Sequence, residues 1–181
     1  MLFNPNASFA LAERLHSRAG APLAEVFSFV SGLYFRGKAA YARAFGHTVR
    51  GSAAFVMSAG GGLLALDEPV TLARLRGWAE VAIHEHNPHF TAPLIRYASE
   101  LSQTHDERAR FVLLGSVATN KYVAPLREVF AERLLFPLDF VGRGDMSRGS
   151  LLLRAAREGR ELAYAPVGTA PEPTPTQFDF Y

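Results

Sequence analysis

The fold prediction rests mainly on residues 110–165, which read RFVLLGSVATNKYVAPLREVFAERLLFPLDFVGRGDMSRGSLLLRAAREGRELAYA. Short apolar runs alternate here with longer segments whose apolar residues recur at helical spacing. The expected elements are strand 111–114, helix 122–131, strand 134–137, helix 148–158 and strand 162–165. Apolar strands that alternate with amphipathic helices are typical of a parallel sheet with helices on both faces and right-handed crossovers. We therefore predict an α/β fold with a mainly parallel sheet, a Rossmann-like three-layer sandwich.

The chain before residue 110 is expected to add further helices and strands to the same domain. The expected elements are a helix capped by Asn6 and running to Ala19, a strand 26–30 with a helix as the alternative, a helix 38–45, a strand 53–58, a helix from the cap Thr71 to Ala82, and a helix 92–101. The total of 181 residues fits one domain. We predict a single domain over residues 1–167 and a Pro-rich tail over 168–181.

Composition narrows the class of protein. Hydrophobic residues make up 49% of the chain and charged residues 20%, which is typical of a globular protein. Cysteine is absent, which excludes disulfides and thiolate metal sites. A net charge of +2 does not by itself indicate nucleic acid as a partner. The first residues carry no basic region ahead of an apolar one, and no long apolar run follows, so we expect a cytoplasmic protein without a membrane segment.

Loops that follow strands are the candidate binding sites, because ligands of open α/β sheets bind outside the carboxyl ends of the strands. The first such loop is 60–62, three successive glycines around Gly61, which indicate either a close approach to a ligand or a plain turn. The second is 115–121, where Ser116, Thr119 and Lys121 precede a helix. These groups and the helix N-terminus predict an anion site, and ordinary helix capping is the alternative.

The third candidate loop, residues 140–149, combines three glycines with two arginines and a carboxylate. Arg143 and Arg148 have the forked geometry that binds phosphate or carboxylate, and Ser147 lies between them. Asp145 is the candidate general acid or base. The alternative is that Asp145 only caps a helix and forms an internal ion pair.

Two further features bear on the site. Both lysines of the chain, Lys38 and Lys121, lie in segments that carry other candidate residues, so Lys38 is added to the predicted ligand-binding set. His84 and His86 are two residues apart and are followed by Pro88, a spacing that does not indicate a metal site. No metal is predicted, and the sequence does not identify a cofactor.

Several short motifs over residues 33–150 resemble a bacterial and phage family of largely unassigned function. Residues 33–36 (Leu-Tyr-Phe-Arg) and 57–67 (Met-Ser-Ala-Gly-Gly-Gly-Leu-Leu-Ala-Leu-Asp) resemble the family's Leu-Tyr-x-Ser-x-x-Phe and Leu-Ser-Ala-Lys-His-Gly-Leu-Leu-x-Pro-Asp. Residues 115–126 and 137–144 are similar to its Gly-x-x-Tyr-x-x-Pro-Leu and Pro-Leu-x-Gly segments. Gly60 and Gly61 replace the family's Lys-His pair, so only a backbone role carries over there.

The resemblance implies a compact α/β domain linked to modification of nucleobases or nucleic acids. Our first hypothesis is an enzyme that acts on a nucleoside, a nucleotide or a nucleic-acid base, with Asp145 as the acid or base and with Tyr34 and Arg36 closing the pocket. The second is a non-catalytic module that binds nucleotides, other phosphate-bearing small molecules or nucleic acid. The third is a protein that acts through a partner-binding surface.

Overall fold

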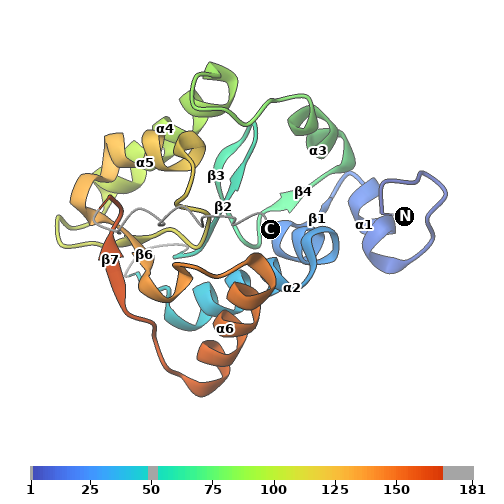
Figure 1. Ribbon diagram of the computed structural model, residues 1–181. Coiled ribbons are helices and arrows are strands. Elements are labelled where there is room, and N and C mark those ends of the chain that lie inside the picture. Colours follow the sequence, from blue (N-terminus) through green and yellow to red (C-terminus); the bar gives the residue numbers. More distant parts are fainter. Residues whose placement is uncertain (1, 49–52, 169–181) are drawn as a thin grey trace, which may run out of the picture.

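The computed structural model describes residues 2–48 and 53–168, and helices dominate it (Figure 1). The helices are α1 Ala10–His16, α2 Leu23–Phe45, α3 Leu72–Ala79, α4 Pro88–Thr104, α5 Asn120–Phe130 and α6 Asp145–Glu158, with short 3-10 turns η1 Ala131–Arg133 and η2 Leu138–Phe140. The strands are β1 Ala21–Pro22, β2 Phe55–Ser58, β3 Gly62–Ala65, β4 Pro69–Val70, β5 Phe111–Val112, β6 Leu134–Pro137 and β7 Tyr164–Pro166. The predicted tail, apart from Gly168, lies outside the described residues.

The strands form three small sheets. β1 pairs with β4, and β2 pairs with β3 in a hairpin, both antiparallel. The third sheet has the order β5-β6-β7, in which β5 and β6 are parallel but β6 and β7 are antiparallel. The prediction of a mainly parallel, Rossmann-like three-layer sandwich is therefore wrong.

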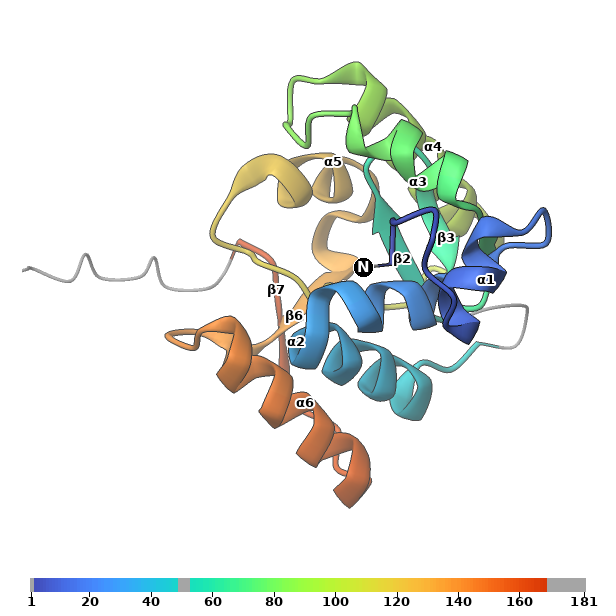
Figure 2. The ribbon, with the colours of Figure 1, turned by 90° about the vertical axis from the view of Figure 1, so that its right-hand side faces the viewer.

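The error arises at the second crossover. α5 connects the parallel strands β5 and β6 and packs on their sheet, as the pattern predicts for a βαβ unit. α6 instead leaves the sheet and packs along α2 (Figure 2). The chain turns at Gly159, which has φ +61°, and returns as β7 in the opposite direction to β6. An apolar run buries its side chains equally well in either direction, so its sequence does not reveal this difference.

Two glycines allow α2 and α6 to approach closely. A Cβ atom at Gly37 would lie 2.6 Å from the backbone oxygen of Gly149, and one at Gly149 would lie 2.8 Å from the Cα atom of Tyr34. Both distances are too short for a real Cβ contact, so any side chain would push the helices apart. The sequence analysis placed Gly149 in a candidate binding loop, and the structure accounts for it by helix packing.

The two faces of the β5-β6-β7 sheet bury different side chains because successive residues of a strand point to opposite sides. Phe111, Leu113 and Phe136 pack with residues of α4 and α5. Leu114 and Tyr164 lie on the other face and pack with residues of α2 and α6. Helices therefore cover this sheet on both sides, although it has only three strands.

The N-terminal part differs from the prediction in two elements. Residues 26–30 are not a strand but lie inside the 23-residue helix α2, which is interrupted at Gly32 with φ +62° and ψ −139°. α1 begins after Phe9, so Asn6 is not its cap. The predicted cap Thr71 is confirmed, since its hydroxyl accepts from the backbone N–H of Arg74 at 3.4 Å.

Candidate functional site

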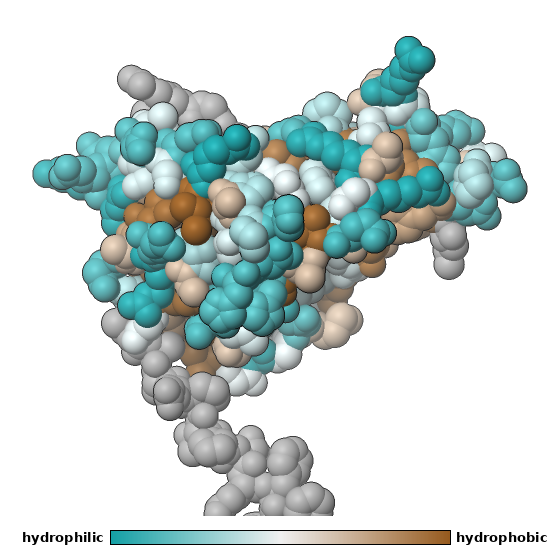
Figure 3. Space-filling view, turned by 90° about the horizontal axis from the view of Figure 1, so that it is seen from above, coloured by the Kyte–Doolittle hydropathy of each residue, from teal (hydrophilic) through white to brown (hydrophobic). Residues whose placement is uncertain are grey.

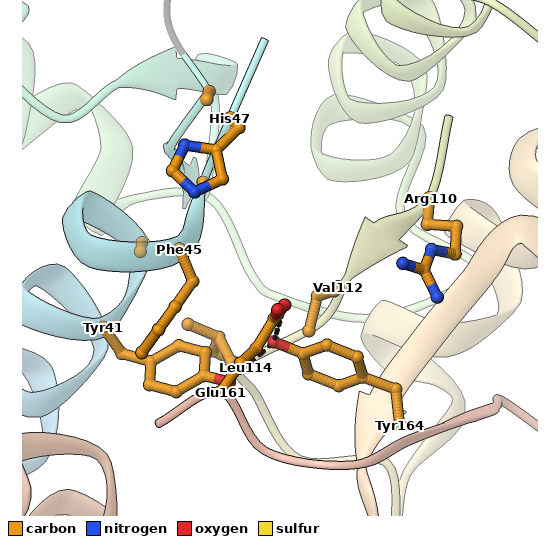
Figure 4. Close-up of a pocket in the computed structure, with 11 residues that line it drawn as sticks. Tyr41, Phe45, His47, Arg110, Val112, Leu114, Glu161 and Tyr164 are labelled. Carbon is orange, nitrogen blue, oxygen red and sulfur yellow. Dashed lines mark hydrogen bonds between the residues drawn. The ribbon is translucent and has the colours of Figure 1, made fainter. Parts of the chain in front are cut away.

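A pocket of about 330 Å³ lies between the C-terminal end of α2 and the β5-β6-β7 sheet. We call it the α2–β5 pocket (Figure 4). Its lining is partly apolar, with Phe45, Val112 and Leu114. The polar side chains that line it are Tyr41, His47, Arg110, Glu161 and Tyr164. Pockets of this kind, apolar with a few converging polar groups, are the usual form of a small-molecule site.

Simple periodicities bring these residues together. Arg110, Val112 and Leu114 are two residues apart, so they share one face of β5 and its flanks. Tyr41 and Phe45 are four residues apart and share one face of α2. The sheet face and the helix face meet across the pocket. The site is therefore built from one strand face and one helix face.

A directed chain of hydrogen bonds crosses the floor of the pocket. The Tyr164 hydroxyl donates to Glu161 Oε1 at 2.9 Å. It carries one proton, so it must accept in its 2.6 Å contact with the Tyr41 hydroxyl, which therefore donates. The Tyr41 hydroxyl accepts in turn from the backbone N–H of Leu162 at 2.8 Å. The chain runs from the Leu162 amide through two tyrosines to the Glu161 carboxylate, and we call it the tyrosine relay.

The relay hydroxyls stay protonated at neutral pH. Burial is the main cause that raises the pKa of Tyr164 far above its ordinary value of 10.0, and the hydrogen bonds with Tyr41 and Glu161 raise it further. Burial likewise raises the pKa of Tyr41. Neither tyrosine serves as a proton acceptor near pH 7, so the relay holds and orients groups.

Basic side chains lie across the pocket from the relay. Figure 4 shows His47, at the end of α2, and Arg110, just before β5, on the side opposite Glu161 and Tyr164. Within residues 2–48 and 53–168, the Arg110 side chain forms no hydrogen bond or ion pair. Its guanidinium is therefore available to a ligand.

Four of the predicted site residues do come together, next to this pocket. Tyr34 and Lys38 lie one turn apart on α2, and Asp145 and Arg148 lie on the first turn of α6. The Lys38 ammonium lies 3.9 Å from the centre of the Tyr34 ring. The Tyr34 hydroxyl donates to the backbone oxygen of Leu114 at 3.3 Å, and Leu114 also lines the α2–β5 pocket.

The charges in this cluster are incompletely balanced. Burial lowers the pKa of Lys38, Asp145 opposes that effect, and Arg148 adds to it. Arg148 donates from Nε and Nη2 to the backbone oxygen of Phe140 at 3.2 and 3.0 Å. Asp145 lies 3.8 Å from Arg148 Nη1 and its side chain is 72% exposed. Arg148 thus ties η2 to α6, which accounts for it without a ligand, and a catalytic role of Asp145 stays a prediction.

The remaining predicted residues lie apart from that cluster. Arg143 donates to the Ser147 hydroxyl at 3.1 Å on the exposed surface of the third loop. Arg36 is exposed on α2. Their roles in ligand binding stay predictions.

The second loop begins next to the cluster but does not join it. Lys121 contacts the ring of Tyr122, and Thr119 is the N-cap residue of α5, although its side chain makes no capping hydrogen bond. The Ser116 hydroxyl accepts from the backbone N–H of Ala118 at 3.3 Å. In the described part of the chain, no hydrogen bond or ion pair links these three side chains to Lys38 or Arg148. The anion site predicted at this loop stays a prediction.

The triple-glycine loop forms the turn of the β2–β3 hairpin. Gly61 donates its backbone N–H to the Ser58 hydroxyl at 2.9 Å. A Cβ atom at Gly61 would lie 2.6 Å from that hydroxyl oxygen and 2.8 Å from the Trp78 ring. Packing in the turn therefore explains this glycine, as the alternative in the sequence analysis held, and its role in ligand binding stays a prediction.

A second pocket, of about 410 Å³, has a different character. It lies among α2, β2 and α3, with Phe3 and Val30 at its exposed border. Ser58, Arg76 and Trp78 supply its polar lining atoms, and the rest is apolar. The face of the molecule seen from above shows hydrophobic areas interrupted by hydrophilic residues (Figure 3). This pocket offers apolar contact but has few groups that would orient a polar ligand.

The sequence analysis did not identify Arg110, His47, Glu161 or Tyr164 as site residues. One signal was available, because a tyrosine in a buried strand requires a partner for its hydroxyl. The sequence does not reveal that this partner is Tyr41, which lies 123 residues earlier in the chain. Within the described residues, no group of three or more His, Asp and Glu side chains could hold a metal ion.

Comparison with known proteins adds no relative. No protein-family model, curated protein or solved structure matches the chain. The family resemblance noted from the sequence therefore stays a prediction. In the described ranges, no helix has both the length and the apolar character needed to cross a bilayer.

Proposed function

We propose that the protein binds a small organic anion in the α2–β5 pocket, with Arg110 as the main ligand of the anionic group and His47 as a second polar contact. The observation that carries this proposal is the Arg110 guanidinium, which faces the pocket without a partner among the described residues. Arginine forms paired, charge-assisted hydrogen bonds with carboxylate and phosphate groups. The ligand is therefore a carboxylate or a phosphate ester.

The size of the pocket limits the ligand. Its volume of about 330 Å³ is near the lower end of the range of small-molecule sites, roughly 300–1,000 Å³. The apolar side chains of Phe45, Val112 and Leu114 would contact the carbon skeleton. A compact metabolite fits this description better than a long or branched molecule.

The pocket supports binding more directly than catalysis. Its tyrosines remain protonated, and the carboxylate Asp145, the predicted acid or base, does not line it. The proposal therefore agrees with the hypothesis of a non-catalytic binding module. A specific role in nucleotide or nucleic-acid chemistry is not proposed, because it relied on the resemblance and on a Rossmann-like fold that the structure does not have.

Thermal unfolding with a panel of carboxylates, phosphate esters and nucleotides tests the proposal. A ligand at about a hundredfold over its Kd stabilises the folded state by about 2.7 kcal/mol. Arg110→Ala should abolish the shift. Arg154→Ala should preserve it, because Arg154 is an exposed arginine on α6 away from the pocket. A shift of equal size in both variants, or none with any compound of the panel in the unmodified protein, would contradict the proposal.

A further inference from the structure

We infer that the α2–β5 pocket selects amphoteric ligands, molecules that carry an amine together with the anionic group, and that Glu161 binds the amine. This inference rests on the proposed function and names the ligand class of the same site. It follows from the position of the carboxylate, from its unused oxygen and from the basic residues across the pocket.

Glu161 has one oxygen available. Its Oε1 accepts from the Tyr164 hydroxyl, whereas its Oε2 has no hydrogen bond or ion pair within the part of the chain that the structure describes. Figure 4 shows the carboxylate directed into the pocket. A carboxylate accepts hydrogen bonds from several donors, so the bond from Tyr164 leaves room for an ammonium group.

The tyrosine relay holds the carboxylate in place. Leu162, whose backbone N–H begins the relay, is 8% exposed and directly follows Glu161 in the chain. Tyr41 is 2% exposed and anchors the relay to α2. The side chain of a surface glutamate normally moves among several rotamers, and ordering it costs free energy on binding. The relay lowers that cost because it orders Glu161 before the ligand arrives.

Opposite charges lie on opposite sides of the pocket without neutralising each other. No ion pair joins Arg110 and Glu161, and neither residue pairs with another described side chain of opposite charge. The pocket therefore keeps an acidic and a basic group apart across a space of about 330 Å³. A ligand that carries both charges can satisfy both groups at once, whereas a simple carboxylate leaves Glu161 close to its own negative charge.

Isothermal titration with ω-amino carboxylates from glycine to 6-aminohexanoate, and with the matching carboxylates that lack the amine, tests the inference. The unmodified protein should prefer the amino compound of the best chain length by roughly ten- to a hundredfold, since hydrogen bonds to charged groups are among the strongest. Glu161→Gln should bind the simple carboxylate at least as well but lose the preference. The glutamine oxygen still accepts from Tyr164, so this variant should keep its fold, which circular dichroism checks.

Each outcome separates the inference from the proposed function. Equal affinity for the amino and simple carboxylates would overturn the inference and leave the proposed function in place. A preference that survives in Glu161→Gln would also overturn it, because another group would then bind the amine. If neither series binds, or if Arg110→Ala binds both series normally, the proposed function fails and the inference fails with it.

Discussion

At the scale of single residues, the Tyr164 hydroxyl links two parts of the molecule that are distant in sequence. It accepts from Tyr41 on α2 and donates to Glu161 just before β7. Removing the hydroxyl leaves both neighbours with an unmade hydrogen bond in a partly buried place. Such groups are costly because they lose water without gaining a protein partner.

Tyr164→Phe should destabilise the protein by about 1–3 kcal/mol at pH 7, measured by urea unfolding. The difference from the unmodified protein should shrink above pH 10. The folded-state pKa of Tyr164 is raised above the unfolded value of 10.0, so the unfolded chain loses this proton first and the stability due to the hydroxyl falls as pH rises.

Tyr97→Phe is the control for that measurement. The Tyr97 hydroxyl forms no hydrogen bond within the described ranges, so its removal should change the stability little at any pH. An equal loss in both variants would show that the tyrosine relay does not contribute to stability.

At the scale of elements, the crossing of α2 and α6 depends on Gly37 and Gly149. The same crossing places Lys38 and Tyr34 next to the first turn of α6. Four residues predicted as parts of the site from two separate segments are therefore neighbours because of helix packing. The sequence analysis found the residues, but the contact between their helices was not visible in either segment.

Gly149→Ala should lower the free energy of unfolding by about 1–3 kcal/mol, because the added methyl group would lie 2.8–3.1 Å from the α2 backbone. Gly77→Ala is the matched control. Gly77 lies in the exposed helix α3 with no atom within 4 Å of an added Cβ, so the change should stabilise that helix by about 0.5–1 kcal/mol. Chemical denaturation measures both, and an equal response would contradict the close crossing.

Element prediction succeeded where the local signals agreed. The strand over 134–137 has the predicted bounds, and the Thr71 cap is present. Residues 26–30 were predicted as a strand because a short apolar run fits a buried strand as well as a buried helix. In the structure these residues belong to the longer helix α2, where packing against other helices and strands decides the outcome.

At the scale of the whole molecule, the tyrosine relay connects α2, in the N-terminal half, to the chain that enters β7. Leu162 donates its N–H to Tyr41 across 121 residues of sequence. The α2–β5 pocket lies beside this connection, so the two walls of the site come from opposite ends of the chain. The site exists only when both halves are folded together.

Tyr41→Phe should make the Leu162 amide exchange its hydrogen roughly tenfold faster, because the amide loses its acceptor. Hydrogen exchange followed by NMR measures the rate. The Leu113 amide, which donates to the Leu135 backbone oxygen at 2.8 Å, is the internal control and should keep its rate. Unchanged exchange at Leu162 would mean that the contact does not persist in solution.

The sequence by itself determined the order of strands and helices after residue 110, the Thr71 cap and the exclusion of cysteine chemistry. These depend on side-chain types and on spacings of a few residues. Only the tertiary structure decided the direction of β7, the α2–α6 crossing and the α2–β5 pocket. Each of these depends on contacts between residues far apart in the chain, which local periodicity does not encode.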